Sequence, residues 1–179
     1  MDWIKFAKDV GFEDVCELNI SALVVMQEVR DMCAADRCRI YGTNWACPPG
    51  CGSITDCAKR IGRYESGILV QTVGSLEDEF DIEGIGRANR LHDARFKTLA
   101  RQLQKLLPDC LPLSAGPCTR CEVCTYPPKT CRFPRKRLSS MEAYGLLVSD
   151  VCTRSGMPYY RGPNTITFSS CVLLERKGV

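Results

Sequence analysis

The 179-residue sequence has little histidine, no long apolar run and little net charge, and each shortage argues against a class of protein. His92 is the only histidine, which excludes a hydrolytic zinc site built on several imidazoles. No uninterrupted apolar run approaches the ~20 residues that cross a bilayer, so no membrane partner is expected. The net charge of +3 is spread along the chain, which argues against nucleic acid as the main partner.

Signal and catalytic motifs are missing as well. Residues 1–15 lack a basic stretch followed by an apolar one, so we expect no secretion signal and a cytoplasmic, reducing compartment. The sequence has neither a Walker phosphate-binding loop nor a recognisable Cys-His-Asn set. It is instead rich in cysteine, with 13 residues, an odd number that rules out complete disulfide pairing. In a reducing compartment these cysteines are expected to be thiols or metal ligands.

The length of 179 residues and the lack of an internal repeat beyond two cysteine loops predict one domain spanning residues 1–179. Its composition, 45% hydrophobic and 25% charged, is that of an ordinary globular protein. Hydrophobic periodicity predicts its helices and strands. The expected helices cover residues 2–10, 21–33, 85–107 and 141–154. The expected strands cover residues 14–20, 67–73, 111–116 and 165–175. Alternation of this kind predicts an α/β fold, with α+β as its variant. We expect a small sheet covered by helices, carrying two irregular cysteine-rich loops at residues 33–57 and 118–131.

The sharpest chemical signal is the stretch GPCTRCEVCTYPPKTCRFP at residues 116–134. Cys118, Cys121 and Cys124 are separated by two residues each, and Cys131 follows after six more. Zinc usually takes Cys-x-x-Cys pairs from two places, whereas three cysteines at this spacing wrap around an iron–sulfur cubane. We therefore favour a [4Fe–4S] cluster over zinc, with disulfides last. The longer final spacing leaves open whether Cys131 ligates this cluster or another.

The first cysteine loop offers five candidates for a site of four ligands, namely Cys33, Cys38, Cys47, Cys51 and Cys57. The two prolines after Cys47 resemble the Cys-Pro ending of a cluster loop and set the chain direction there. Tyr41 and Trp45 either shield a cluster from water or are ordinary core residues. This loop alone suits zinc as well as iron, but beside the second loop it favours iron–sulfur.

The stretches CRIYGTNWACPPGCGSITDC, GPCTRCEVCTYPPKTCRFP, SMEAYG and NTITF together resemble an uncharacterised cysteine-rich family of anaerobic bacteria and archaea. Its members are described only as predicted metal-binding proteins, and the resemblance covers roughly residues 29–174. The resemblance implies two sites of four ligands, Cys33, Cys38, Cys47 and Cys57 in one and Cys118, Cys121, Cys124 and Cys131 in the other. Cys51 falls outside the family pattern and stays an alternative ligand. The resemblance implies no reaction.

The remaining cysteines and the histidine receive structural interpretations. Cys16, Cys152 and Cys171 fall in expected strands or helices, where a buried cysteine acts as a small hydrophobe. Cys110 has no assigned role. His92 lies in the charged helical segment ANRLHDARF, and we expect it to be solvated.

Two charged segments have structural and functional interpretations. The acidic residues in 78–83 are expected to cap a helix and face solvent. The basic run at 132–137 is either solvated or acts on a nearby cluster, because cations favour its reduced state and attract an acidic partner.

We expect a protein with two [4Fe–4S] clusters that transfers electrons to or from a partner enzyme or a small cofactor. All-cysteine ligation saturates the irons, which suits electron transfer rather than substrate binding. Two alternatives stay open: a cluster-dependent enzyme whose substrate binds an exposed iron, and a structural zinc module for interactions. The sequence assigns no substrate and no oligomeric state.

Overall fold

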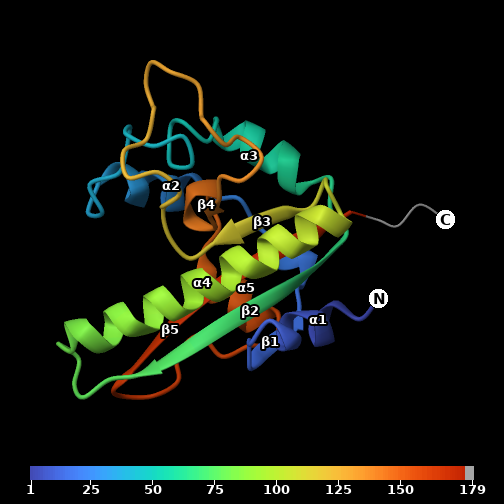
Figure 1. Cartoon of the computed structure of the whole chain (residues 1–179), viewed down its shortest axis with the longest axis vertical. Coiled ribbons are helices and arrows are strands. Elements are labelled where there is room, and N and C mark those ends of the chain that lie inside the picture. The colour runs from blue at the N-terminus through green and yellow to red at the C-terminus, as the bar shows by residue number, and fades with distance from the viewer. Residues whose placement is uncertain (176–179) are drawn as a thin grey trace.

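The computed structural model describes residues 1–175 as one mixed sheet with helices packed on it (Figure 1). Its strands are β1 (Asp14–Glu17), β2 (Ser66–Ser75), β3 (Leu111–Ser114), β4 (Ser139–Ser140) and β5 (Thr165–Leu174). They lie in the order β1-β2-β5-β3-β4, and only β3 and β4 run parallel. The predicted α/β architecture is confirmed, in a mainly antiparallel form.

The helices of the described residues are α1 (Trp3–Asp9), α2 (Gln27–Ala34), α3 (Ile54–Ile61), α4 (Ile82–Leu106) and α5 (Val148–Arg154). Two short 3-10 turns, η1 (Ile20–Ala22) and η2 (Glu142–Tyr144), join them. The long helix α4 runs along β2 and β5, and α2 and α3 lie with the cysteine loops above it in Figure 1. No helix in residues 1–175 is long and apolar enough to cross a membrane.

The core lies on both faces of the sheet because side chains alternate along β2 and β5. Leu69 and Leu173 belong to the cluster that includes α3 and α5, whereas Val70 and Val172 belong to the cluster under α4 and α1. Phe96 of α4 is buried in this second cluster. The sheet is therefore covered on both faces, as an apolar strand pair requires.

The second cysteine loop begins and ends at one place on the sheet. β3 ends at Ser114, β4 begins at Ser139, and the two strands are hydrogen-bonded neighbours. Residues 115–138 therefore leave the sheet and return beside their own starting point. This loop and the first cysteine loop lie side by side at the top of Figure 1.

Three predicted helix boundaries are wrong. The helix expected from residue 21 begins only at Gln27, because the 3-10 turn η1 ends at Ala22 and Val25 then pairs with Leu146. The helix expected over 141–154 breaks at Gly145, whose φ of +77° ends the turn η2 before α5 starts. The first cysteine loop, expected to be irregular up to residue 57, contains the start of α3, which Ser53 caps.

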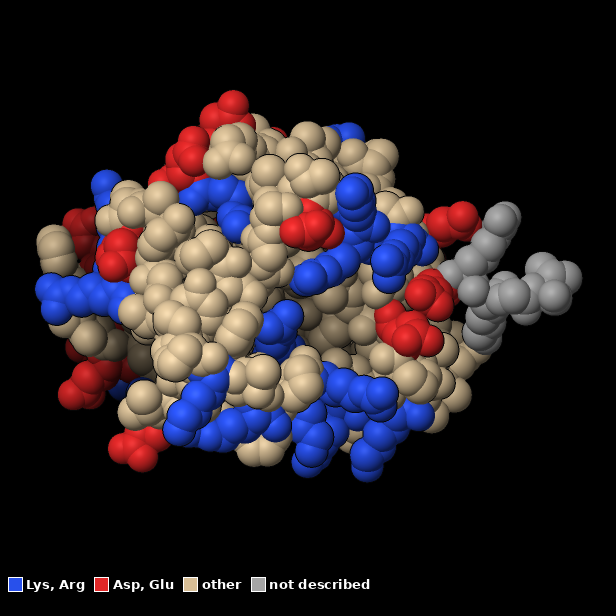
Figure 2. All heavy atoms as spheres, turned by 90° about the horizontal axis from the view of Figure 1, so that it is seen from above, with Lys and Arg blue, Asp and Glu red and all other residues tan. Residues whose placement is uncertain are grey.

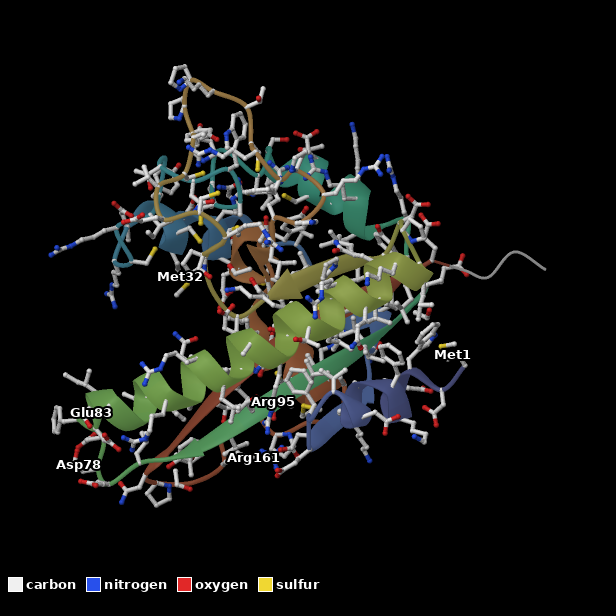
Figure 3. The ribbon with its side chains drawn as sticks, in the orientation of Figure 1. Met1, Met32, Asp78, Glu83, Arg95 and Arg161 are labelled. Carbon is white, nitrogen blue, oxygen red and sulfur yellow. The ribbon has the colours of Figure 1, made fainter. Side chains whose placement is uncertain are left out.

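The acidic segment fulfils its expected role. Asp81 caps α4 by accepting a hydrogen bond from the backbone N–H of Gly84, 2.7 Å away. Glu83 forms a loose ion pair with Arg87 at 3.8 Å and is otherwise solvated. Asp78 and Glu83 lie at the far end of α4 from the cysteine loops (Figure 3). The acidic cluster is thus separate from any site formed by the cysteines.

The prediction that His92 is solvated is wrong. Its side chain is 2% exposed and lies between α4 and the sheet. Nδ1 lies 3.0 Å from Thr72 Oγ1, and Nε2 lies 2.7 Å from Ser170 Oγ. Both ring nitrogens are satisfied by hydroxyl groups, which is how a neutral imidazole is accommodated in an apolar core. Burial and, to a smaller extent, the nearby Arg95 together lower the pKa of His92 to about 4.

We expect the imidazole of His92 to stay neutral down to a pH of about 4 in the folded protein. Between there and about 6.5 the unfolded chain binds one more proton, so stability should fall by up to about 1.4 kcal/mol per pH unit as pH decreases. His92 is the only histidine, so its NMR signals can be followed without assignment. The urea-unfolded chain is the control and should titrate near its ordinary pKa. A folded-state titration near that same value would contradict this burial.

Candidate metal centre

The four cysteines of the second loop meet around one small pocket. Cys118, Cys121, Cys124 and Cys131 all line it, and each is partly exposed. The Cys-x-x-Cys-x-x-Cys segment and the later Cys131 therefore face a common space although they are up to 13 positions apart. Arg120, Arg132 and Arg137 line the same pocket, which places cations beside the thiols.

The first cysteine loop packs directly against this pocket. The Asn44 side-chain amide donates to the carbonyl oxygen of Cys118 at 3.1 Å. The backbone N–H of Trp45 points at Cys124 Sγ, 3.5 Å away, and its indole N–H donates to the Lys129 carbonyl at 2.9 Å. Trp45 also meets Tyr126 edge-on, with ring centroids 4.8 Å apart. Trp45 thus covers the cysteine pocket, whereas Tyr41 is 37% exposed and belongs to no core cluster.

Cys47 connects the cysteines of the two loops. Burial, together with the neighbouring Cys38, Cys33, Cys118 and Cys124, raises the pKa of its thiol to about 12. Such mutual influence requires the sulfurs to lie near one another. Several sulfur atoms indeed gather between α2 and the cysteine loops (Figure 3). The two groups of predicted ligands therefore adjoin at Cys47.

Cys57 occupies a buried position with its own cation. It lies in α3 at 0% exposure, and Arg30 of α2 directs Nη1 at its sulfur from 3.5 Å. The same guanidinium donates to the carbonyl oxygens of Ala143 at 2.9 Å and Gly52 at 2.8 Å, which fixes its orientation. A hydrogen bond from the Cys51 thiol and the charge of Arg30 together lower the pKa of Cys57 to about 7. The surroundings of Cys57 therefore stabilise its thiolate form.

The structure does not bring the four predicted ligands of the first loop to one point. Cys33 and Cys38 adjoin Cys47, whereas Cys57 lies against Cys51 and Arg30. In residues 1–175 no three His, Cys, Asp or Glu side chains are arranged to hold a metal ion. Both sets of four ligands stay predictions, and Cys51 stays an alternative ligand beside Cys57.

The donor chemistry nevertheless fits a thiolate-bound metal group. The eight predicted ligands are all cysteines, and none of the 13 cysteines forms a disulfide. Thiolates suit iron–sulfur clusters and zinc, and they suit magnesium or calcium poorly. Because burial keeps Cys33 and Cys47 protonated, metal binding there would release protons.

A comparison with known protein families shows to which family the chain belongs. The family described as "Predicted metal-binding protein (DUF2284)" matches residues 16–174. The chain belongs to this family. All 13 cysteines lie within the matched residues, so membership of the predicted metal-binding family supports a metal-binding role for the domain. No curated protein and no solved structure matches the chain.

The cysteines outside both loops have structural surroundings. Cys152 and Cys171 are fully buried, as expected, and Cys16 is partly buried, with its sulfur 3.4 Å from the Ser155 carbonyl oxygen. Cys110 is buried in the cluster under α4, and burial raises the pKa of its thiol to about 11. Cys110 therefore packs as a core residue away from both cysteine loops.

Two important residues escaped the sequence-based prediction. Arg30 and Asn44 are both buried polar residues, at 9% and 8% exposure, that hold the cysteine region together. Arg30 lies in an amphipathic helix, and only its position three residues before Cys33 could have pointed to a role near the cysteines. Asn44 directly precedes Trp45, and nothing in the sequence distinguishes it from a loop residue.

We expect Gly50→Ala to weaken the packing between the two loops. A Cβ atom there would lie 2.6 Å from the Asn44 carbonyl oxygen, 3.0 Å from Trp45 Cα and 3.1 Å from Tyr126 Cδ2. Relieving these contacts should cost about 1–3 kcal/mol of unfolding free energy and lower the metal content of the purified protein. Thermal unfolding and metal analysis measure the two effects. Gly116→Ala is the matched control, because no atom lies within 4 Å of its added Cβ. Equal behaviour of both variants would contradict the close packing.

Proposed function

We propose that this member of the metal-binding family is an iron–sulfur protein with two [4Fe–4S] clusters that transfers electrons to or from a partner enzyme or small cofactor. The observation that carries the proposal is the pocket lined by Cys118, Cys121, Cys124 and Cys131. Three of them have the spacing that wraps a cubane, and the fourth faces the same space. A zinc ion would need only four thiolates in a tetrahedron, and the Cys-x-x-Cys-x-x-Cys spacing is less typical of that arrangement.

The surrounding cations suit the charge of such clusters. A [4Fe–4S] group bound by four thiolates supplies one-electron redox chemistry and is negatively charged in both oxidation states. Arg120, Arg132 and Arg137 line the second-loop pocket, so their charges offset a negative group held there. Arg30 has the same role at Cys57 in the first loop. Trp45 covers the pocket and limits the access of water, which protects a cluster against hydrolysis and oxidation.

The direct test is metal analysis of protein purified without oxygen. We expect about eight irons and about eight acid-labile sulfides per chain, with an absorbance band at roughly 400 nm that bleaches on reduction. Electron paramagnetic resonance of the reduced protein should show a cluster signal. Colourless, redox-silent protein with stoichiometric zinc would instead identify a structural zinc module. Four irons with an open coordination position would favour a cluster-dependent enzyme.

We expect Cys131→Ser to damage one cluster and spare the other. Because Cys131 lines the same pocket as Cys118, Cys121 and Cys124, the loss should be confined to that site, and iron should fall from about eight to about four per chain. Cys16→Ser is the control, since Cys16 lies outside both loops and its contact is one that a hydroxyl can also make. Full iron content in Cys131→Ser would remove this residue from the ligand set.

A further inference from the structure

A cavity of about 670 Å³ lies beside the cysteine pocket. Its walls come from α4, from the two ends of the second cysteine loop and from Arg60 of α3, and its floor comes from β3 and β4. The space-filling view shows a hollow, rimmed by Lys and Arg, on the face that carries the cysteine loops (Figure 2). We call this feature the basic cleft. Its volume lies in the range of about 300–1,000 Å³ that small-molecule sites occupy.

The lining of the basic cleft is strongly cationic. Its charged residues include two aspartates, Asp93 and Asp109, and eight cations: Arg60, Lys97, Arg101, Lys105, Arg120, Arg135, Lys136 and Arg137. The net charge of the whole chain is only +3, so positive charge is concentrated here. A concave, positively charged surface focuses its field and raises the local concentration of anions.

Within residues 1–175, most of these cations form no ion pair with a carboxylate. Lys97 is neutralised by Asp93 at 2.6 Å and also contacts Thr119 Oγ1 at 2.7 Å. Of the remaining seven, none forms an ion pair within 4.0 Å with another residue of the described chain. Like charges held close together without counter-ions repel one another, and a bound anion relieves this repulsion. The unpaired charge points to an anionic ligand.

The walls of the basic cleft are held by specific contacts. Arg60 Nη1 donates to the Cys51 carbonyl oxygen at 3.0 Å and to the Tyr144 hydroxyl at 3.1 Å. Across the opening, Gln104 Nε2 of α4 donates to the Arg135 carbonyl oxygen at 3.1 Å, which joins the helix to the second loop. These contacts fix the distance between the two walls, so the cleft is a defined cavity rather than a loose groove.

The basic cleft and the cysteine pocket share residues. Cys118, Arg120 and Arg137 line both. A molecule bound in the cleft would therefore lie against one predicted cluster ligand and two of the cations beside it. This adjacency separates the basic cleft from an ordinary charged surface patch.

We propose that the basic cleft binds a small molecule carrying two or more phosphate or carboxylate groups, and that it holds this molecule beside Cys118. The concave shape and volume favour a small molecule over an acidic protein surface, which would need a broad and shallow contact area. Anion binding in the cleft stands without the proposed function, whereas its role next to a redox centre rests on it. The small cofactor named there is then a polyanion.

Isothermal titration calorimetry of anaerobically purified protein with inorganic pyrophosphate and with citrate, at about 0.15 M ionic strength, tests the binding. We expect saturable binding of at least one probe, and the better of the two distinguishes phosphate from carboxylate chemistry. The double variant Arg101→Gln, Lys105→Gln removes two exposed charges of the cleft wall and should weaken binding about tenfold. Thermal unfolding checks that this variant is folded.

The matched control is the double variant Lys8→Gln, Arg90→Gln, which removes the same charge from exposed positions outside the cleft and should bind like the unaltered protein. If both double variants bound the probes equally weakly, the loss of affinity would come from the overall charge of the protein, and the proposal would be overturned. Absence of binding by both probes would also overturn it. Binding of poly-glutamate with no binding of either small anion would instead identify a protein-docking surface.

A separate measurement tests whether the bound molecule lies beside Cys118. In protein that contains iron, a saturating concentration of the bound probe should shift the electron paramagnetic resonance signal of the reduced cluster. An unchanged signal despite calorimetric binding would overturn this placement. Protein that contains only zinc would disprove the proposed electron transfer, while the calorimetric comparison would still decide whether the cleft binds anions.

Discussion

The packing of Asn44 and Trp45 on the second cysteine loop is the contact on which the rest of the cysteine region depends. Residues 115–138 contain only short turns, so the sheet holds them only where they leave β3 and enter β4. The contacts of Asn44 with Cys118 and of Trp45 with Cys124 and Lys129 attach the middle of this loop to the first one. Cys47 follows two residues after Trp45, close enough to Cys118 and Cys124 of the second loop for them to help raise the pKa of its thiol.

The regular part of the fold was predictable because its sequence signals are local. The apolar run of β2 and the alternation along β5 predict paired, buried strands, and the periodic leucines of α4 predict a long helix. The errors arise where tertiary contacts override local pattern. His92 looked solvated among charged neighbours, yet α4 turns it toward the hydroxyls of Thr72 and Ser170. The helix expected through Gly145 stops because that residue is left-handed and packs tightly against Ile54 and Met26.

The sequence showed that the candidate site is built from cysteines, but it did not show how their side chains are arranged in space. Cysteine spacing indicated one site for Cys118, Cys121 and Cys124 and left Cys131 open, and only the family resemblance added it. All four residues line one pocket. The first loop has five cysteines over 25 positions, and their grouping depends on how α2 and α3 pack. Arg30 demonstrates the difficulty, because its guanidinium reaches Cys57 from another helix, 27 positions away in sequence. Cysteine spacing cannot predict that contact, although it contributes to lowering the pKa of the Cys57 thiol.

The shared lining of the basic cleft and the cysteine pocket has a thermodynamic consequence under the two proposals. Arg120 and Arg137 would interact both with a cluster and with a bound polyanion, and both of these are negatively charged. Reduction adds one negative charge to the cluster, so it should weaken anion binding, and anion binding should make the cluster harder to reduce by the same free energy. Because reduction would weaken its binding, the anion would be released after the electron arrives at the cluster. The placement of these two arginines therefore suits a site where redox state controls the occupancy of the cleft.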